Sequence, residues 1–203
     1  MMKNAESISI IIPAAGKSSR MGDSDKLLLS LDGKTLLKLA VLKAVNSTAK
    51  EVIVVLRQDQ LFRLKEIEDF PVKIVYSTHQ LNLMSNSIQA GLDRVEPSAL
   101  GVLIFLPDMP LITTSDLNTL IDCFHEEHIV QACNHNQQPG HPVLFPRQIL
   151  SNSFKISGDE GLRTLLQANA SSVYFVPLEG NRALVDVDTP DDWKKLTGAG
   201  EGT

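Results

Sequence analysis

The sequence has few cysteines, no excess of basic residues and no long apolar run, and each of these features excludes a class of protein. Its 203 residues include two cysteines, Cys123 and Cys133, without C-x-x-C spacing, which indicates free thiols in a reducing compartment. The net charge of −5 argues against broad nucleic-acid binding, which needs a basic surface. No apolar run reaches the ~18 residues of a membrane span, and the first seven residues lack a signal-peptide cleavage pattern. We therefore expect a cytoplasmic protein that contacts neither nucleic acid nor membrane.

Hydrophobic residues make up 43% of the sequence, as in globular proteins, and they gather in short runs that alternate with helix-period segments. The runs typical of strands are Ser7–Pro13, Glu51–Leu56, Lys73–Tyr76, Gly101–Leu106, Ile129–Cys133, His141–Phe145, Val173–Val176 and Leu184–Val187. This order predicts an α/β fold, with a Rossmann-like, mostly parallel twisted sheet flanked by helices. We expect one domain over residues 1–196 and a flexible Gly-rich tail over residues 197–203.

The first loop at the carboxyl ends of the strands, where ligands bind in such sheets, combines small residues with cations. Small residues let backbone N–H groups approach phosphate oxygens, while Arg20 offers a planar fork and Lys26 a mobile charge. The spacing matches neither a Walker loop nor G-x-G-x-x-G. A basic, solvated surface loop is the alternative. The residues expected to bind a nucleotide here are Ala14, Ala15, Gly16, Lys17, Ser18, Ser19, Arg20 and Lys26.

The second loop at that edge holds one carboxylate between prolines. Asp108 follows the apolar run that ends at Leu106, and it stands between Pro107 and Pro110. Proline fixes φ and stiffens a loop, and Mg²⁺ prefers one or two carboxylates together with substrate phosphates. We therefore interpret Asp108 as a Mg²⁺ ligand. The alternative is a turn-forming residue that caps the helix expected near Thr113.

A further pair of carboxylates lies near the C-terminus. Asp186 and Asp188 are two residues apart at the end of an expected strand, so their side chains would point the same way. Pro190 suits the first turn of a helix that follows. We expect Asp188 to be the second metal ligand, with Asp186 in reserve. The alternative is an aspartate that caps this helix.

Three more segments complete an ordered pattern that resembles a known family. They are Met84–Leu92, Gly140–Val143 and Gly158–Arg163, which lie among the three loops described above. By themselves His141 and the segment 158–163 identify no ligand, since Asp159 there also suits a helix cap. Together the six pieces resemble, in order, the MobA/MocA-type family of molybdenum-cofactor nucleotidyltransferases. Ala15 and the Gly-His-Pro sequence at 140–142 are most similar to its cytidylyltransferase branch and to related xanthine dehydrogenase accessory proteins.

The resemblance implies a fold like that of nucleotide-diphospho-sugar transferases and a specific reaction. CMP would pass from CTP to the terminal phosphate of molybdopterin with release of pyrophosphate, for maturation of a molybdenum hydroxylase such as xanthine dehydrogenase in purine metabolism. It also implies a transient contact with that hydroxylase or its chaperone. The implied roles are catalysis for Arg20, Lys26 and Asp108, base recognition for Ser85 and Ser87, acceptor binding for Gly140, His141, Pro142, Asp159, Gly161 and Arg163, and Mg²⁺ binding for Asp108 and Asp188.

Three alternatives remain open from the sequence. Leu83 replaces a glycine that the family usually has before Met84, which leaves GTP in place of CTP as an alternative nucleotide. Pro13 is shared with the cytidylyltransferases of isoprenoid synthesis, so another small phosphate is an alternative acceptor. A carrier that binds the cofactor without catalysis is the alternative from another class.

Overall fold

The computed structural model describes residues 7–18, 21, 24–77, 84–152 and 161–198, and a seven-stranded sheet runs through them. The strands are β1 (Ile8–Pro13), β4 (Glu51–Leu56), β5 (Lys73–Tyr76), β6 (Gly101–Ile104), β7 (Ile129–Cys133), β8 (Pro139–Pro146) and β9 (Val173–Pro177). Their order is β5-β4-β1-β6-β8-β7-β9, and neighbours pair in parallel except that β8 runs antiparallel to β6 and β7. The mostly parallel sheet predicted from the sequence is therefore confirmed.

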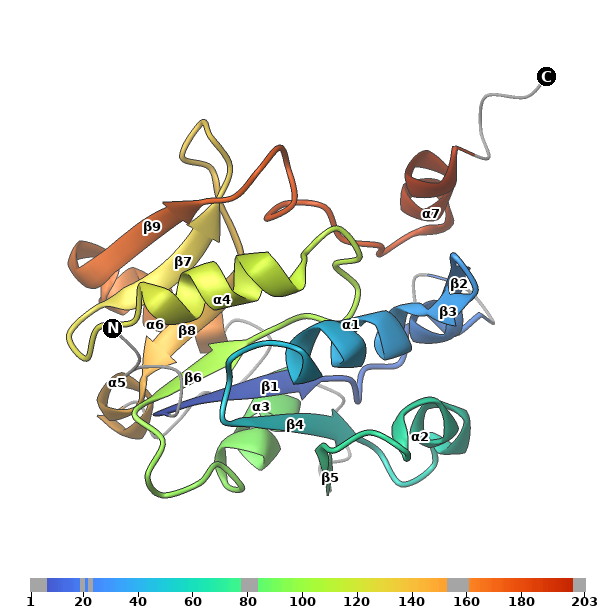
Figure 1. Cartoon of the computed structure of the whole chain (residues 1–203), viewed down its shortest axis with the longest axis horizontal. Coiled ribbons are helices and arrows are strands. Elements are labelled where there is room, and N and C mark those ends of the chain that lie inside the picture. The colour runs from blue at the N-terminus through green and yellow to red at the C-terminus, as the bar shows by residue number, and fades with distance from the viewer. Residues whose placement is uncertain (1–6, 19–20, 22–23, 78–83, 153–160, 199–203) are drawn as a thin grey trace.

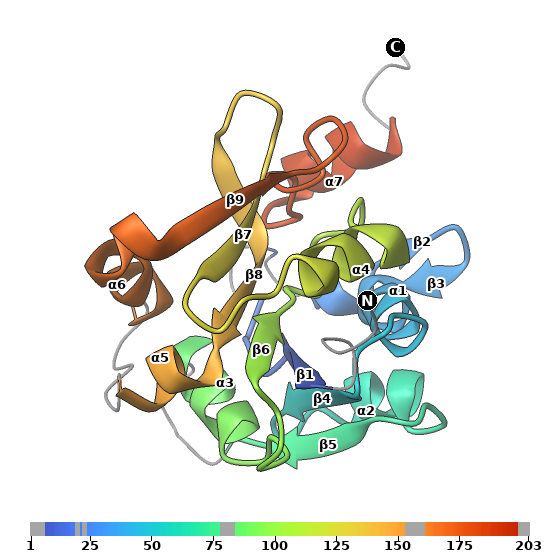
Figure 2. The ribbon, with the colours of Figure 1, turned by 60° about the vertical axis from the view of Figure 1, so that its left-hand side comes forward.

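Helices cover both faces of this sheet (Figures 1 and 2). They are α1 (Leu36–Val45), α2 (Leu61–Ile67), α3 (Met84–Leu92), α4 (Thr114–Asp122), α5 (Arg147–Asn152), α6 (Gly161–Ala168) and α7 (Pro190–Thr197), with 3₁₀ turns η3 (Lys26–Leu28) and η4 (Ala170–Ser172) and a small ribbon of β2 (Ser30–Leu31) and β3 (Lys34–Thr35). Because side chains alternate along β1, Ile10 and Ile12 pack toward α1, α2 and α4, while Ile11 packs toward α3, α5 and α6. Two separate apolar layers thus enclose the sheet.

The topology brings the sequence-predicted loops to one edge. β1 and β6 are adjacent and parallel, so the loops that follow them both lie at the carboxyl edge of the sheet. α3 packs closely on β1 and β4 because Gly91 has no side chain; a Cβ there would lie 2.9 Å from Ile11 Cγ2. This close approach holds the C-terminal end of α3 against the central strands, and Ser85 and Ser87 are buried near its start.

One predicted strand, Leu184–Val187, is wrong. The N–H groups of Leu184 and Val185 donate to the Asn181 carbonyl at 2.9 and 3.2 Å, and that of Val187 donates to the Asp108 carbonyl at 2.9 Å. The backbone is therefore used in a turn and in one contact with the loop after β6. β9 pairs with β7 instead.

Two smaller expectations can be compared with the structure. Cys133 is buried and Cys123 half-buried, and both are free thiols, as the sequence predicts. Of the helices in the described part of the chain, none combines the length and apolar character needed to cross a bilayer.

Candidate active site

A lysine and two aspartates from distant parts of the chain meet at the carboxyl edge. Lys26 opens η3, Asp108 follows β6, and Asp188 precedes α7. The Lys26 Nζ donates to Asp108 Oδ2 at 2.5 Å and to Asp188 Oδ1 at 2.6 Å. The side chains of Lys26 and Asp108 keep only 17% and 13% of their surface exposed. Residues up to 162 positions apart thus share one partly buried ion-pair cluster.

The local structure removes both helix-cap alternatives for these aspartates. Thr189 is the N-cap of α7 and forms a reciprocal capping box with Asp192, with a proline in the first turn. Thr113 caps α4 in the same way. Neither Asp108 nor Asp188 is therefore used as a helix cap.

Negative charge exceeds positive charge in this cluster. Burial works to lower the pKa of Lys26, but the charges of Asp108 and Asp188 and their hydrogen bonds outweigh it and raise that pKa. For Asp186, the protein packed around it raises the pKa, and the charges of Asp108 and Asp188 raise it further. Three carboxyl groups around one ammonium group leave an excess of negative charge, which favours binding of a further cation.

Three buried polar atoms near this edge have no hydrogen-bond partner among the described residues. They are Asp108 Oδ1, His141 Nδ1 and Ser85 Oγ. Buried polar atoms in native proteins are almost always hydrogen-bonded, so each orphan requires an explanation. All three belong to segments that the sequence singles out for ligand binding, which indicates that a ligand or ion supplies the partners.

His141 is held at the start of β8, where β8 pairs with β6 at the carboxyl edge. Its N–H donates to the Ala183 carbonyl at 2.9 Å, and the peptide bond to Pro142 is cis. Burial lowers the pKa of the imidazole, although the Asp108 charge acts against this shift. Gly140 is required beside it, since a Cβ there would lie 1.9 Å from the Ala183 oxygen.

The loop after β1 presents backbone donors. The N–H groups of Ala15, Gly16, Lys17 and Ser18 have no acceptor among the described residues, whereas the Ala14 N–H still bonds to the Val55 carbonyl at 2.9 Å. A Cβ on Gly16 would meet no atom of the described residues within 4 Å. Successive N–H groups without an acceptor in the described segments are suited to binding an anion.

Sequence reasoning missed two residues beneath this loop. Arg63 on α2 is only 2% exposed, and its Nε and Nη2 donate to Asp25 Oδ2 and Oδ1 at 2.7 and 2.6 Å. The sequence gives no signal for this pair, because Arg63 is buried while its apolar neighbours Leu61 and Phe62 are exposed. Once the burial is known, a partner for the charge is expected.

Several predicted site residues are not brought to this cluster by the structure. Ser19, Arg20 and Asp159 lie outside the described residues. Gly161 opens α6, and Arg163 is exposed on it. Figures 1 and 2 show α6 beside the start of β9, on the opposite side of the molecule from α7. Pro142 lies with His141 in β8, and Ser85 and Ser87 are buried in α3.

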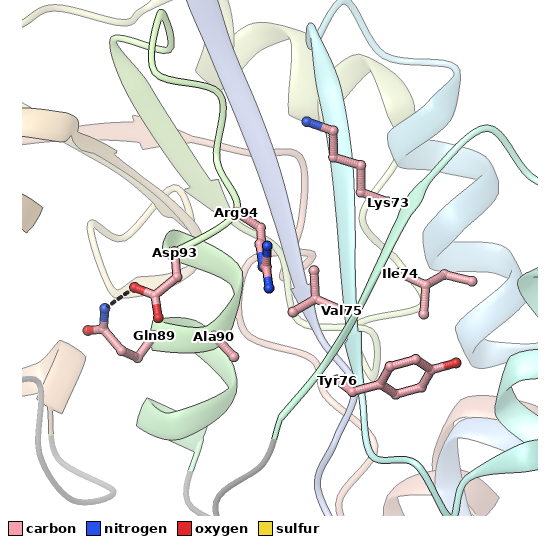
Figure 3. Close-up of a pocket in the computed structure, with 8 residues that line it drawn as sticks. All are labelled: Lys73, Ile74, Val75, Tyr76, Gln89, Ala90, Asp93 and Arg94. Carbon is pink, nitrogen blue, oxygen red and sulfur yellow. Dashed lines mark hydrogen bonds between the residues drawn. The ribbon is translucent and has the colours of Figure 1, made fainter.

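Two other features lie away from the carboxyl-edge loops. An open groove of about 820 Å³ runs between β5 and α3, where Arg94 and Ala90 face Val75 (Figure 3). His125, Glu127 and His128 bring three ligating atoms within 4.8 Å of one another, but they are exposed just before β7, at the amino edge. Neither feature includes a residue of the Lys26 cluster.

Comparison with known sequences places these observations among related proteins. The chain is 24% identical to the molybdenum cofactor cytidylyltransferase of Escherichia coli over 92% of this chain and 93% of the relative. It is 25% identical to a probable molybdenum cofactor guanylyltransferase of Thermococcus sibiricus, over 93% and 97%. It is also 24% identical to the nicotine blue oxidoreductase of Paenarthrobacter nicotinovorans, over 92% and 94%. Such different names at similar identity mean that likeness alone does not define the reaction.

Comparison with solved structures and with family models agrees on the fold. The structure of the Mycobacterium tuberculosis Rv0371c homolog from Mycobacterium sp. strain JC1 matches with a TM-score of 0.84 and 28% identity over 96% of each chain. The fold is that of the nucleotide-diphospho-sugar transferases. The model of the MobA-like NTP transferase domain matches residues 10–173. The chain therefore belongs to the family of MobA-like NTP transferase domains.

Proposed function

We propose that this protein transfers CMP from CTP to the terminal phosphate of molybdopterin, the organic part of the molybdenum cofactor, and releases pyrophosphate. The observation that carries the proposal is the cluster of Lys26, Asp108 and Asp188 beside a loop whose backbone N–H groups have no acceptor in the described part of the chain. Backbone N–H groups that can bind an anion lie next to a site with excess negative charge. This combination suits a triphosphate that binds together with a divalent cation. The molybdenum-cofactor relatives support the choice of acceptor.

The residues present fit a divalent cation. The buried Asp108 Oδ1 has no protein partner within the described part of the chain, and carboxylate oxygens are the ligands that Mg²⁺ and Mn²⁺ prefer. We assign the cation to Asp108 and Asp188, with Asp186 next to them. When bound, the cation would neutralise charge on the phosphate oxygens.

The chemistry requires positioning more than acid–base catalysis. A phosphate monoester has a second pKa near ~6 and is mostly dianionic at neutral pH, so the acceptor needs no general base. One acceptor oxygen attacks the α-phosphorus, and the bond to the bridging oxygen breaks as pyrophosphate leaves. Lys26 and Arg20 offset the charge that develops on the phosphates. The loop from Ala14 to Ser19 holds the triphosphate in line with the acceptor. Its backbone donors begin at Ala15, since the Ala14 N–H bonds to the Val55 carbonyl.

The remaining roles separate the nucleotide from the acceptor. Ser85 and Ser87 lie where the base is read, and the orphaned Ser85 Oγ supports this assignment. His141, between Gly140 and Pro142, faces the acceptor with an imidazole that burial keeps mostly neutral. For Asp159, Gly161 and Arg163 the acceptor role rests on the family resemblance, since α6, which carries the last two, lies on the opposite side of the molecule from α7.

A matrix of nucleotides and acceptors tests the proposal. Release of pyrophosphate is measured with CTP or GTP and with molybdopterin, molybdenum-loaded cofactor, methylerythritol phosphate or a sugar phosphate as acceptor, in the presence of Mg²⁺. Turnover with CTP and molybdopterin or its molybdenum-loaded form is expected. Faster turnover with GTP would reassign the base, and turnover only with another phosphate would reassign the acceptor. Binding of cofactor without Mg²⁺-dependent binding of CTP in calorimetry would identify a carrier.

We further propose that the product serves the maturation of a molybdenum hydroxylase such as xanthine dehydrogenase, and that the protein contacts this hydroxylase or its chaperone transiently. A cofactor that is labile when free needs direct transfer to the enzyme that uses it. The test is activation of a cofactor-free hydroxylase by the protein with its product bound. Equal activation by free product at the same concentration would contradict the contact.

A further inference from the structure

Side chains at the start of α2 donate hydrogen bonds to backbone carbonyl groups of the loop after β1. Arg63 Nη1 donates to the Ala14 carbonyl, and Gln60 Nε2 lies 3.3 Å from the carbonyl oxygens of both Ala15 and Gly16. Three consecutive carbonyl groups of the loop are therefore turned toward α2.

Peptide geometry converts these contacts into a direction for the N–H groups. In a planar trans peptide, the C=O of one residue and the N–H of the next point in opposite directions. With the carbonyls of Ala14, Ala15 and Gly16 turned toward α2, the N–H groups of Ala15, Gly16 and Lys17 must point away from it. Those are the N–H groups that lack an acceptor within the described segments.

The same arginine also fixes the residue before Lys26. Both Asp25 oxygens are held by the Arg63 fork, and Asp25 Oδ1 accepts from the Leu27 N–H at 3.1 Å as the N-cap of η3. Ser18, which has a left-handed φ of 54°, accepts from Arg63 Nη2 at 3.2 Å. One guanidinium thus links the start, the middle and the far end of the loop.

We propose that Arg63, with Gln60 in a smaller part, is a positioning residue that aims the loop amides and Lys26 at the phosphates of the nucleoside triphosphate. Arg63 is buried beneath the loop and acts through it, without touching the ligand. The inference rests on the proposed function for the identity of the ligand. Only arginine provides the planar fork for Asp25 together with a third N–H for the Ala14 carbonyl.

The test compares Arg63→Lys with a matched control that disturbs a buried charge far from the loop. Lysine keeps the charge but loses the fork. Gln60→Met removes the donor to the Ala15 and Gly16 carbonyls together with the Oε1 atom that accepts from the Arg57 N–H. The control is Glu51→Gln at the amino edge, where Glu51 pairs with Lys73 at 2.8 Å. Thermal unfolding establishes that all variants are folded at the working temperature. Binding of CTP and of GTP with Mg²⁺ is then measured by calorimetry, and KM and kcat by pyrophosphate release.

We expect Arg63→Lys to weaken nucleotide binding by at least about tenfold and to raise KM more than it lowers kcat. Gln60→Met should weaken binding by about threefold, since its contacts are longer, and Glu51→Gln should leave binding unchanged. Two substitutions of Asp25 extend the test. Asp25→Ala should also weaken nucleotide binding, and Asp25→Asn should weaken it less, because asparagine keeps an oxygen that can accept from the Leu27 N–H at the start of η3. Wild-type affinity in Arg63→Lys would overturn the proposal.

A readout without ligand separates this inference from the proposed function. Backbone order parameters of the Ala15, Gly16 and Lys17 amides are measured by NMR in the free protein. They should fall toward the flexible range, below about 0.6, in Arg63→Lys and stay unchanged in Glu51→Gln. If the wild type binds neither CTP nor GTP, the proposed function fails, and these order parameters still decide whether Arg63 fixes the loop. Unchanged order parameters would overturn that role.

Discussion

The amino and carboxyl edges of the sheet both carry a cluster of charged residues, but the charges are paired differently at the two edges. At the amino edge, Glu51 accepts from Ser9 Oγ at 2.5 Å and from the Glu96 N–H at 2.8 Å, and it pairs with Lys73 at 2.8 Å. At the carboxyl edge, Lys26 is shared between two aspartates, and Asp108 Oδ1 has no partner among the described residues. Glu51 Oε2 is buried without a hydrogen bond of good geometry, but the Lys73 ammonium group lies 2.8 Å from it. The charge of Glu51 is therefore balanced within the protein, whereas the carboxylates at the carboxyl edge outnumber their cation.

The pKa shifts express the same difference. Burial works to raise the pKa of Glu51, but hydrogen bonds from Lys73, Ser9 and the Glu96 N–H outweigh it and lower that pKa. Asp186 at the other edge has a raised pKa because of the protein around it and the charges of Asp108 and Asp188. A carboxylate whose ionised form is stabilised by the surrounding protein adds to the free energy of unfolding. Carboxylates that repel one another, as at the carboxyl edge, are instead suited to binding a cation. The predictions that follow test this distinction.

The largest expected effect is on catalysis at the carboxyl edge. Asp108→Asn removes a charge from the cation site while it keeps the shape of the side chain. We expect the rate of pyrophosphate release to fall by about 10³-fold or more, with a small change in the midpoint of thermal unfolding. Glu51→Gln is the matched change at the amino edge and should leave the rate within about twofold of the wild type. Equal loss of rate in the two variants would contradict the comparison.

A substitution of Lys26 tests whether the carboxylates at the carboxyl edge carry more negative charge than the lysine neutralises. In Lys26→Met the ammonium group no longer competes for the oxygens of Asp108 and Asp188, so Mn²⁺ alone should bind more tightly, by about tenfold. The same change should lower turnover by about 10²-fold because the phosphates lose a cation. Calorimetry with Mn²⁺ in the absence of nucleotide checks the first effect. Weaker Mn²⁺ binding in Lys26→Met would show that the lysine supports the cation site instead of competing for it.

The parts of the fold that the sequence predicted correctly are those with local causes. The strands β1 and β4 follow from β-branched runs, and the start of α4 follows from the helix signal near Thr113. In each case the cause lies in residues that are adjacent in the sequence. The segment Leu184–Val187 has the same apolar character but forms no strand, since its N–H groups bond to Asn181 and to Asp108. Propensity alone cannot detect a backbone contact with a loop some 80 residues earlier.

The candidate site shows the same limit. The sequence placed Asp108 at the correct edge because strand ends are predictable from apolar runs, and spacing suggested Asp188 although the strand behind that argument does not exist. Arg63 and Asp25 were missed because their roles come from a contact between residues 38 positions apart. The ion pair of Lys26 with both aspartates likewise depends on tertiary structure.

The ion pair and hydrogen bonds of Glu51 at the amino edge should contribute to the free energy of unfolding, and this contribution should depend on pH. The lowered pKa of Glu51 means that its contribution is fully present above the unfolded-state pKa of about 4.3 and is lost as pH falls through the folded-state pKa. Glu51→Gln should therefore lower the free energy of unfolding by about 1–3 kcal/mol at pH 7. The difference from the wild type should shrink as the pH falls below about 4. Urea unfolding at several pH values measures both effects, and a pH-independent difference would contradict the ionic origin.

The smallest expected effect concerns how the fold places Asp188 at the incomplete edge. Thr189→Ala removes the hydroxyl that accepts from the Asp192 N–H at 3.2 Å and donates to its carboxylate at 2.7 Å. Loss of such a cap costs about 1 kcal/mol of helix stability, and fraying of α7 would loosen the turn that holds Asp188 against Lys26. Mn²⁺ affinity should then fall by a few-fold. The control is Thr113→Ala, the same change at the N-cap of α4, which should leave Mn²⁺ affinity unchanged because the segment before α4 is also held by the hydrogen bond from Lys43 to the Pro110 carbonyl. Equal Mn²⁺ affinities in the two variants would show that the cap of α7 does not position Asp188.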